Sequence, residues 1–479
     1  MRSAKELATF AAFVALAGCS FAPAYHPPST PTPPAYKEVS APPPAGWLVA
    51  EPGDAAERGT WWRSFGDATL DDLETRVERA SPTLAAALAR YDAARAQVRA
   101  AGADLYPTPS IGASAERDRV SARRPLSNGA AATYKDFIVG GSIDYELDLW
   151  GRVRNEVKAT RAEAQASAAD LADVRLSLQA QLADTYFRLR GLDAEAALLR
   201  QTIDAYARAE SLTRTRHRGG LANGMDVGRA ETVLASARAE LSAIANQRAA
   251  AEHRIAALVG ENATAFTLAP AVLALTPPEI PAGVPSALLQ RRPDIAEAER
   301  RIYAANARIG VARAAFFPSL TLGVGGGFNA AHGALLSTPA TFWALGPAQA
   351  LLTLFDGGRR RAQVAISRAH YEEVAADYRA IVLAAFQQVE DGLAAQRLLA
   401  QESEDRHAAA DAARRTESLA LTRYRDGASD YLEVVTAQTA ALDAERAALA
   451  VDTQRMQAAV ALVRALGGRA EENATRKSA

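Results

Sequence analysis

The segment 292-RPDIAEAERRIYAANARIGVARAAFFPSLTL-322 occurs twice in this chain in related form. Its first copy is 81-SPTLAAALARYDAARAQVRAAGADLYPTPSI-111, so that Pro82 aligns with Pro293, 211 residues further on. Beyond these segments the offset becomes 207, and it stays constant through Arg152 and Arg359, Gly220 and Gly427, and Gly260 and Gly467. A constant offset on each side of one short deletion indicates a duplicated chain rather than two similar alanine-rich stretches.

Each copy predicts the same order of elements. A helix of about 35 residues ends before a Tyr-Pro or Phe-Pro pair, a β-like segment follows, and a very long helix runs to a glycine turn. A shorter helix then returns. We expect a first repeat at 61–260, with strands at about 110–147 and helices at 151–216 and 225–259. The second is expected at 286–467, with strands at about 319–355 and helices at 358–423 and 430–466, after a linker, 261–285, and before a tail, 468–479.

The long helices contain no proline and one internal glycine each, Gly191 and Gly392. At ~1.5 Å per residue, ~65 residues span about 100 Å. In the first, mostly apolar side chains recur at steps of three and four, as in a coiled coil. They are Leu171, Val174, Leu178, Leu182, Thr185, Leu189, Leu192, Ala196, Leu199, Ile203 and Tyr206. The second carries two such stripes, Tyr371 to Ala385 and Val382 to Leu393. Two stripes favour a ring of helices, although a plain long bundle gives the same pattern.

The predicted strands alternate between apolar and polar positions. In 136-DFIVGGSIDYEL-147 the odd-numbered residues are mostly apolar, and Asp136, Asp144 and Glu146 lie on the other face. In 319-SLTLGVGGGFNA-330 the apolar residues are even-numbered. Weaker partners are 110-SIGASAERDR-119 and 341-TFWALGPAQALLTLF-355, where Pro347 favours an edge strand or a bend. Strands of about ten residues with one apolar face suit a transmembrane barrel, and an ordinary soluble hairpin shows the same alternation.

Four strands per chain cannot close a barrel, since a bilayer does not tolerate open strand edges and membrane barrels have eight strands or more. If these strands cross a membrane, the chain must therefore form an oligomer, and three copies of four strands would supply 12 around one lumen. On this interpretation Asp136, Asp144 and Glu146 line the lumen and make its exit acidic.

The composition argues against several classes of protein. The net charge is −1, so that no basic field suggests nucleic acid. One cysteine among 479 residues excludes an intrachain disulfide, a cysteine-based zinc site and an iron–sulfur cluster. The six histidines show no HxxxH or HExxH spacing, and 323-GVGGGF-328 lacks the GK[ST] of a phosphate-binding loop. We therefore expect no enzyme activity, no cofactor and no metal site.

The N-terminus predicts export and lipid attachment. Arg2 and Lys5 precede an 11-residue apolar core, which is typical of a secretory leader, 1–18, and too short to span a bilayer. The stretch 15-ALAGCS-20 resembles the lipobox of bacterial lipoproteins, in which the cysteine, here Cys19, begins the mature chain and is acylated. The alternative is that Cys19 is only a small apolar residue near the cleavage site. Prolines in 19–60 favour an extended, semi-rigid tether.

Three stretches resemble the TolC-like outer-membrane factors: 61-WWRSFGDATLDDL-73, the run from Leu288 to Leu322, and 424-YRDGASDYLEVV-435. With its lipobox, the chain is most similar to their lipoprotein (NodT-type) branch, which serves resistance-nodulation-division (RND) efflux pumps. The resemblance implies an α+β membrane protein: a trimeric, 12-stranded outer-membrane β-barrel continued by a long periplasmic α-helical barrel. A collar would come from Gly46–Gly66, Glu261–Pro285 and the residues after Gly467.

The resemblance also implies a function and partners. Such a protein is the passive outer-membrane exit duct of a tripartite efflux system, and it docks on a periplasmic adaptor protein and an inner-membrane RND-type pump. It would be lipid-anchored in the outer membrane and extend into the periplasm. A type I secretion duct has the same fold. A structural periplasmic coiled-coil lipoprotein would share the anchor and the helices but not the amphipathic strands.

The same resemblance implies that the two glycine turns form the periplasmic tip. The residues expected to contact the adaptor are Arg218, Gly219, Gly220, Leu221, Asn223, Arg425, Gly427, Ala428 and Ser429. Leu432 and Glu433 match the apolar and carboxylate rings of a periplasmic gate, with Asp226 as the equivalent of Glu433 in the first repeat. Thr436 stands where the family often has a second aspartate, which makes the acidic ring thinner. Plain helix caps, and a solvated Glu433 favoured by the helix dipole, are the simpler interpretations.

Overall fold

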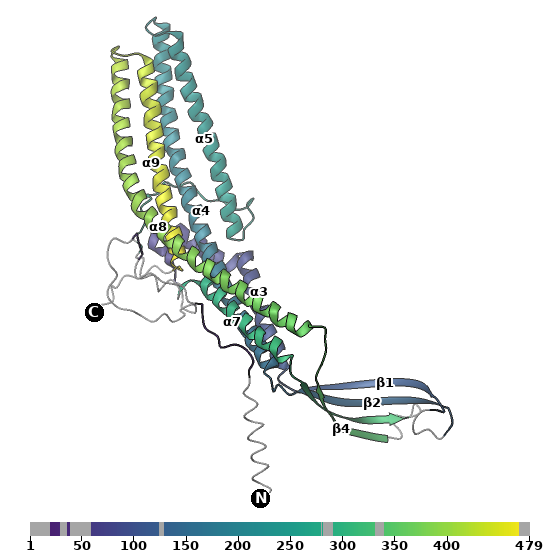
Figure 1. The fold of residues 1–479 in the computed structure, drawn as a ribbon. Coiled ribbons are helices and arrows are strands. Elements are labelled where there is room, and N and C mark those ends of the chain that lie inside the picture. The colour runs from purple at the N-terminus through teal and green to yellow at the C-terminus, as the bar shows by residue number, and fades with distance from the viewer. Residues whose placement is uncertain are drawn as a thin grey trace, which may run out of the picture. The chain divides into compact units, whose positions relative to one another are not determined.

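The computed structural model describes residues 20–28, 36–38, 59–123, 129–278, 280, 291–330 and 340–468 (Figure 1). The leader, Cys19, most of the expected tether, two strand-connecting loops, part of the linker and the tail after Gly468 lie outside the described residues. The chain divides into two compact units. The first unit comprises 1–29, 90–168 and 297–379, and the second comprises 30–89, 169–296 and 380–479. Each unit therefore takes segments from both sequence repeats.

The duplication inferred from the sequence is confirmed by helices of equal length in the two repeats. α3 (Pro82–Ala103) and α7 (Pro293–Ala314) have 22 residues each. α4 (Arg152–Arg218) and α8 (Arg359–Arg425) have 67 each, and α5 (Gly224–Leu258) and α9 (Tyr431–Ala465) have 35 each. The long helices thus extend two residues further than the sequence pattern indicated.

The prediction of a single helix of about 35 residues before the Tyr-Pro pair is wrong. The structure has two helices there, α2 (Ala68–Ala80) and α3, after a short 3-10 helix, η1 (Trp61–Phe65). The break falls at Ser81, whose backbone is extended, because the ring of Pro82 disfavours a helical conformation in the residue before it. Pro82 itself lacks an N–H and fits the first helical position, and α7 begins at the equivalent Pro293.

The first unit contains one antiparallel sheet in the order β1-β2-β3-β4. Its strands are β1 (Thr108–Val120), β2 (Ala132–Glu146), β3 (Ser319–Ala330) and β4 (Ala340–Leu351). The β2–β3 pair joins the two repeats, with Val139 opposite Phe328 and Ile143 opposite Val324. This register places the apolar rows of both repeats on one side, which we call the apolar face. The other side, the polar face, carries Ser142 and Asp144.

β4 is an edge strand with an irregularity in its pairing, as Pro347 predicted. Leu322 pairs with Ala348, but Val324 pairs with Leu345, so that Gly346 and Pro347 together oppose Gly323. A proline cannot donate to a ladder, and an edge or bulge position is where a sheet tolerates one. The other edge strand is β1.

Close helix packing in the first unit depends on small residues. Ala159 and Ala162 of α4 form a buried cluster with Ala304 and Ala307 of α7. On α7, a Cβ added at Gly310 would lie 2.6 Å from the Asn155 side-chain nitrogen and 2.8 Å from the Ala22 backbone nitrogen. A methyl group therefore does not fit there, because α4 and the N-terminal segment both approach the backbone of α7.

Residues 20–28 are docked on the first unit and do not hang free as a tether. The Phe21 ring stacks on Phe317, with centroids 4.4 Å apart, and Phe317 stacks on Trp150 at 4.9 Å. The carbonyls of Phe21 and Pro23 accept hydrogen bonds from Arg313 (3.1 Å) and Asn306 (2.9 Å) of α7. Aromatic stacking and satisfied carbonyls together hold this extended segment against the helices.

In the second unit, the apolar stripe predicted for the first long helix faces the interior. Leu182, Leu189 and Leu199 of α4 are fully buried. The two internal glycines of the long helices both face α9. A Cβ added at Gly191 would lie 2.9 Å from Thr453 Cγ2, and one at Gly392 would lie 3.0 Å from Leu462 Cδ1. At these glycines α4 and α8 thus approach α9 too closely for a larger residue to fit without a shift.

A buried ion cluster fastens part of the linker to the second unit. Asp193 accepts from Arg190 of α4 at 3.0 Å and from Arg248 of α5 at 2.7 Å, and both Arg190 and Asp193 are almost fully buried. Asp193 also accepts from the backbone N–H of Ala271 at 3.1 Å, and Arg190 donates to the carbonyl of Ala269 at 2.8 Å. Breaking one partner of such a cluster would leave an unpaired buried charge, so the cluster fixes where the linker lies.

No described helix is long and apolar enough to cross a membrane. Within the described ranges, no group of three or more histidine, cysteine or acidic side chains is arranged to hold a metal ion.

The two types of helix glycine predict opposite effects of alanine. Gly191→Ala should lower the free energy of unfolding by about 1–3 kcal/mol, because the added methyl overpacks the contact with Thr453. Gly228→Ala in α5 is the matched control: it meets nothing within 4 Å and should be neutral or stabilising by up to about 1 kcal/mol. Thermal unfolding of the detergent-solubilised variants measures both, and equal shifts would contradict this packing.

Candidate functional site at the helical turns

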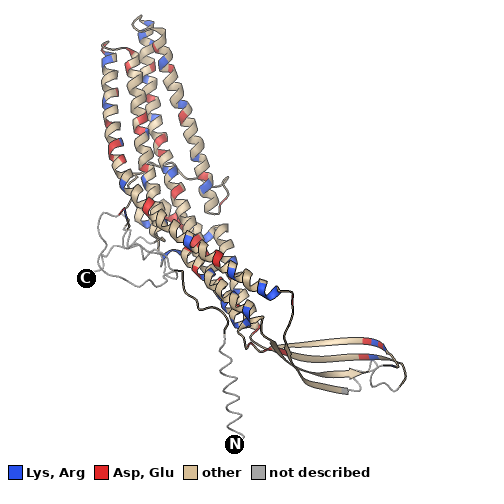
Figure 2. Ribbon diagram, viewed as in Figure 1, with Lys and Arg blue, Asp and Glu red and all other residues tan. Residues whose placement is uncertain are grey.

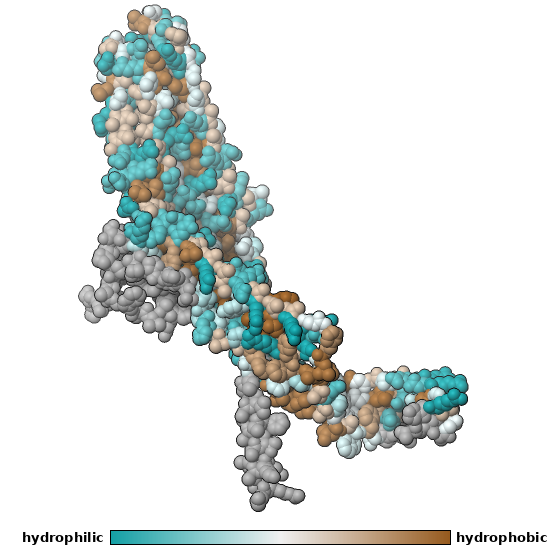
Figure 3. Space-filling model, in the orientation of Figure 1, coloured by the Kyte–Doolittle hydropathy of each residue, from teal (hydrophilic) through white to brown (hydrophobic). Residues whose placement is uncertain are grey.

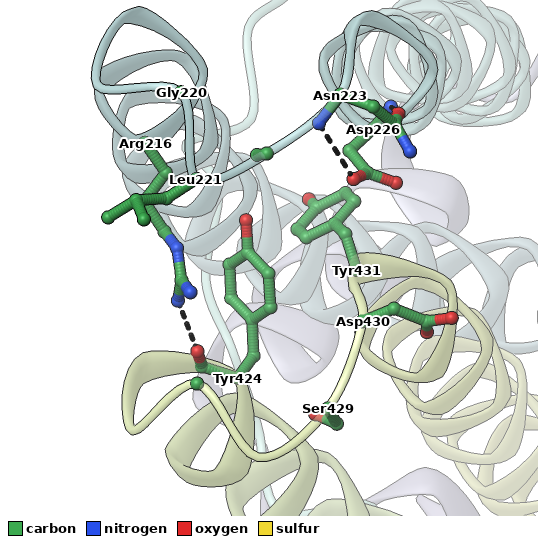
Figure 4. Close-up of a pocket in the computed structure, with 11 residues that line it drawn as sticks. Arg216, Gly220, Leu221, Asn223, Asp226, Tyr424, Ser429, Asp430 and Tyr431 are labelled. Atoms are coloured by element: carbon green, nitrogen blue, oxygen red, sulfur yellow. Dashed lines mark hydrogen bonds between the residues drawn. The ribbon is translucent and has the colours of Figure 1, made fainter.

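Two turns in the second unit reverse the long helices, one between α4 and α5 and one between α8 and α9 (Figure 4). Gly220 and Gly427 have left-handed backbones, with φ of 72° and 76°. The residue after each glycine donates its N–H, at 2.8 Å, to the carbonyl of Arg216 or Arg423. A Cβ at Gly220 would meet nothing within 4 Å, so glycine is needed for its conformation and not for space.

Each returning helix starts at a side-chain cap. The Asn223 side chain accepts from the Asp226 N–H at 2.9 Å, and the Asp226 carboxylate accepts from the Asn223 N–H at 3.4 Å, which is a capping box. Asp430 accepts from the Glu433 N–H at 3.2 Å. The residues predicted to contact an adaptor are exposed, except for the half-buried Ser429: Arg218, Gly219, Gly220, Leu221, Asn223, Arg425, Gly427 and Ala428. The caps hold both turns in defined conformations that leave this surface uncovered.

The predicted gate residues have unequal environments. Leu432 is 46% exposed, and the exposed Glu433 carboxylate lies 3.7 Å from Arg423 Nε. Asp226, its repeat equivalent, is only 7% exposed and occupied by the capping box and by Arg229 at 3.5 Å. The structure therefore brings Leu432 and Glu433 together on the surface of α9 and leaves Asp226 as a structural cap on α5.

Beside the turns, a contact between the two helical hairpins involves residues that the sequence analysis did not single out. The Arg216 guanidinium lies over the Tyr424 ring, with its carbon 4.5 Å from the centroid, and Nη1 donates to the Tyr424 carbonyl (Figure 4). The Tyr424 hydroxyl is 3.3 Å from Thr213 Oγ1 of α4. Cation–π stacking and a charge-assisted hydrogen bond thus act on the same pair of turns.

The duplication makes this contact asymmetric. Arg216 and Arg423 are equivalent in the two repeats, but Arg216 reaches across to α8, whereas Arg423 pairs with Glu433. Two departures from the repeat could have signalled this difference. Tyr424 stands where the first repeat has His217, and Tyr431 stands where it has Gly224.

Tyr431 completes the contact between the hairpins. Its ring meets Tyr424 edge-on at 5.3 Å, and both pack with Ala209, Ala230 and Val434. Its hydroxyl is buried with no hydrogen-bond partner among the described residues. Burial, with a smaller contribution from Tyr424, raises the Tyr431 pKa to about 12. A cavity of about 450 Å³ adjoins these rings and extends between the two turns.

A second set of predicted residues lies on the sheet of the first unit. Asp136, Asp144 and Glu146 share the polar face through the register of β2. Asp144 accepts from Ser142 Oγ at 3.3 Å. Glu146 is bound by Arg152 through two hydrogen bonds, of 2.9 and 2.8 Å. The positive guanidinium compensates Glu146, so this end of the polar face is less acidic than the sequence indicated.

The family of the chain follows from comparison with known proteins. A model of the outer membrane efflux protein family matches residues 75–261 and again 284–468, one match for each repeat. The pyoverdine export outer membrane protein OpmQ of Pseudomonas aeruginosa is 33% identical over 473 residues, covering 97% of each chain. Outer membrane protein OprJ of the same organism is 32% identical over 459 residues, covering 95% of this chain and 93% of OprJ.

Solved structures show the same architecture. The outer-membrane channel OprN superimposes with a TM-score of 0.84 at 29% identity, covering 94% of this chain and 99% of that one. The CmeC outer membrane channel of Campylobacter jejuni, at 22% identity, has the same fold with a TM-score of 0.86 over 95% of this chain and 96% of that one. The expected fold class is therefore confirmed, and the chain belongs to the outer membrane efflux protein family.

Proposed function

We propose that three copies of this chain form the exit duct of a tripartite efflux system. The observation that carries the proposal is the four-stranded sheet, whose edge strands β1 and β4 have free edges and whose apolar face is open. On that face Ile111, Trp343 and Leu345 are 89%, 82% and 84% exposed. Lipid would cover such side chains, and joining β1 of one copy to β4 of the next would satisfy the free edges.

In this duct the polar face lines the lumen, with Asp136 near the loop end of the strands, where the duct exits, Asp144 nearer the helices, and Glu146 neutralised by Arg152. Strands with large apolar side chains on one face and polar groups on the other fit a barrel that faces lipid outside and encloses water. A structural coiled-coil lipoprotein would not need a sheet with an exposed apolar face. We infer no chemical step, because the family consists of efflux channels.

The helical turns are the proposed docking site for a periplasmic adaptor protein, which connects the duct to an inner-membrane RND-type pump. Exposed turn residues on rigid, capped helix ends support this assignment, since a docking surface must be both accessible and preorganised. Leu221, which is 74% exposed, provides an apolar contact at the turn between α4 and α5. Arg218 and Arg425 supply positive charge to the two turns.

We assign the periplasmic gate to Leu432 and Glu433. In a trimer each side chain occurs three times around the axis, so Leu432 forms an apolar constriction and Glu433 a ring of carboxylates that favours cations. The pairing of Glu433 with Arg423 moderates this charge. Asp226 supports the gate indirectly by capping α5.

The gate assignment predicts that Leu432→Ala combined with Glu433→Ala raises the single-channel conductance of trimers in planar bilayers, because the narrowest ring widens and loses its charge. Met225→Ala is the control, since Met225 is the exposed repeat equivalent of Leu432 and lies outside the proposed ring. Unchanged conductance of the double variant would refute the gate. Wild-type protein that neither forms trimers nor conducts would refute the duct.

We expect the contact between Arg216 and Tyr424 to hold the two helical hairpins together at the turns. Arg216→Ala removes a cation–π contact and a charged hydrogen bond, so we expect amide hydrogen exchange at both turns to become about 10–100-fold faster. Arg423→Ala is the matched control from the other repeat. It loses only an exposed ion pair, whose contribution is about 0–1 kcal/mol, and should change exchange much less. Similar effects of both variants would contradict a specific role of the contact between Arg216 and Tyr424.

The lipid anchor is proposed at Cys19, which directly precedes the docked segment. Ser20 Oγ donates to Asn155 of α4 at 3.0 Å, and Phe21 packs on Trp150 and Phe317, which flank the helix-proximal ends of β2 and β3. The chain that directly follows the proposed anchor is therefore held beside the helix-proximal end of the sheet. The anchor supplements the barrel instead of replacing it.

Cys19→Ala should abolish incorporation of radiolabelled palmitate while detergent-extracted protein still forms trimers, because the docked segment and the sheet remain. Labelling of the wild type and cross-linking of both proteins provide the measurement. A wild type without label would remove the anchor from the proposal. Loss of trimers in the variant would show that acylation itself drives assembly.

A further inference from the structure

Charged residues of both signs gather where β1 and β2 meet their connecting loop (Figure 2), and this end of the sheet is hydrophilic (Figure 3). The strand register separates these charges by face. Glu116 is directly opposite Asp136 on the polar face, and on the next rung Arg117 is directly opposite Lys135 on the apolar face. Arg119 lies two residues beyond Arg117 and therefore points to the same side. All acidic residues of these two strands fall on the polar face, and all basic ones fall on the apolar face.

The three cations are not neutralised within the described chain. None of them forms a side-chain hydrogen bond or ion pair with another described residue, and Arg117, Arg119 and Lys135 are exposed. Side chains directly opposite each other in an antiparallel pair lie about 5 Å apart, so like charges there repel. The facing carboxylates cannot relieve this repulsion, because the sheet separates them from the cations.

A neighbouring copy could not supply the missing negative charge either. The strand that would join β1 in a closed barrel is β4, and neither β3 nor β4 contains a charged residue. The connecting stretches 121–131 and 331–339 contain no aspartate or glutamate. The counter-charge for the three cations must therefore come from outside the protein barrel.

The position of the cations along the strand indicates where that charge lies. The apolar row of β2 runs from Phe137 to Leu147, which is ~33 Å along the strand and about 25 Å in height at the usual strand tilt. That height matches the apolar band of an outer-membrane barrel. Lys135 is the next residue of the row, at the end away from α4. It and Arg117 therefore lie just past the hydrocarbon, at the depth of lipid headgroups.

We propose that Arg117, Lys135 and Arg119 form a binding site on the outside of the barrel for the phosphate groups of outer-leaflet lipid, namely lipid A of lipopolysaccharide. Two guanidinium groups offer planar, paired donors that match phosphate oxygens, and the ammonium group adds a third cation. The acyl chains of the same lipid would cover the apolar face directly below. The inference rests on the proposed function, because it requires the sheet to span the outer membrane.

Native mass spectrometry of the full-length, detergent-solubilised trimer tests the site with two probes: bisphosphorylated lipid A and the same lipid after removal of both phosphates. The wild type should bind the bisphosphorylated form at least about tenfold more tightly. The combined variant Arg117→Gln, Arg119→Gln and Lys135→Gln should lose this preference. Glu116→Gln with Asp136→Asn, which changes the same rungs on the opposite face, should keep it.

Equal binding of both lipids by the wild type would contradict the proposed site. A triple variant that still prefers the bisphosphorylated lipid would also contradict it. Conductance of the same preparations separates this inference from the proposed duct. A conducting trimer that binds both forms of the lipid with equal affinity contradicts only the lipid site. A wild type that forms no conducting trimer contradicts the duct and, with it, the site.

Discussion

The free backbone edges of β1 and β4 are the constraint on which the rest of the architecture depends. In lipid no water is available to pair with these groups, and each unsatisfied N–H or carbonyl costs several kcal/mol. A four-stranded sheet is thus complete only when other copies continue it. Because α4 follows β2 and α8 follows β4 directly along the chain, every copy that extends the barrel also adds two 67-residue helices to the assembly.

The pairing of β2 with β3 explains why the repeats are not separate domains. One ladder links residues almost 200 positions apart, so that a strand from each repeat completes the other's apolar face. In the second unit α5 packs with its counterpart α9, and Arg216 of α4 contacts Tyr424 of α8. The symmetry is broken at the turns: Arg216 crosses to Tyr424 between the hairpins, whereas its equivalent Arg423 pairs with Glu433.

Much of this arrangement was predictable, since it follows from local pattern. Alternation gave four strands with the correct residues on each face, and the glycines at 220 and 427 marked both turns. The contact between Arg216, Tyr424 and Tyr431 was not predictable in this way. It joins residues about 210 positions apart whose types are common on helices, and only the packing of α4 against α8 brings them together. Asp226 and Glu433 likewise look equivalent in sequence but differ in burial.

The sequence by itself determined the duplication, the order of the strands and long helices, the polarity of each strand face and the family, because these depend on periodicity and on residues close in the chain. Tertiary structure alone decided which strands pair across the repeats, that residues 20–28 dock on α7, that Arg152 neutralises Glu146, and that like charges of β1 and β2 lie directly opposite each other. These features depend on register and on contacts between distant segments. A shift of one residue in a strand would change which side chains share a face, and local propensity cannot detect such a shift.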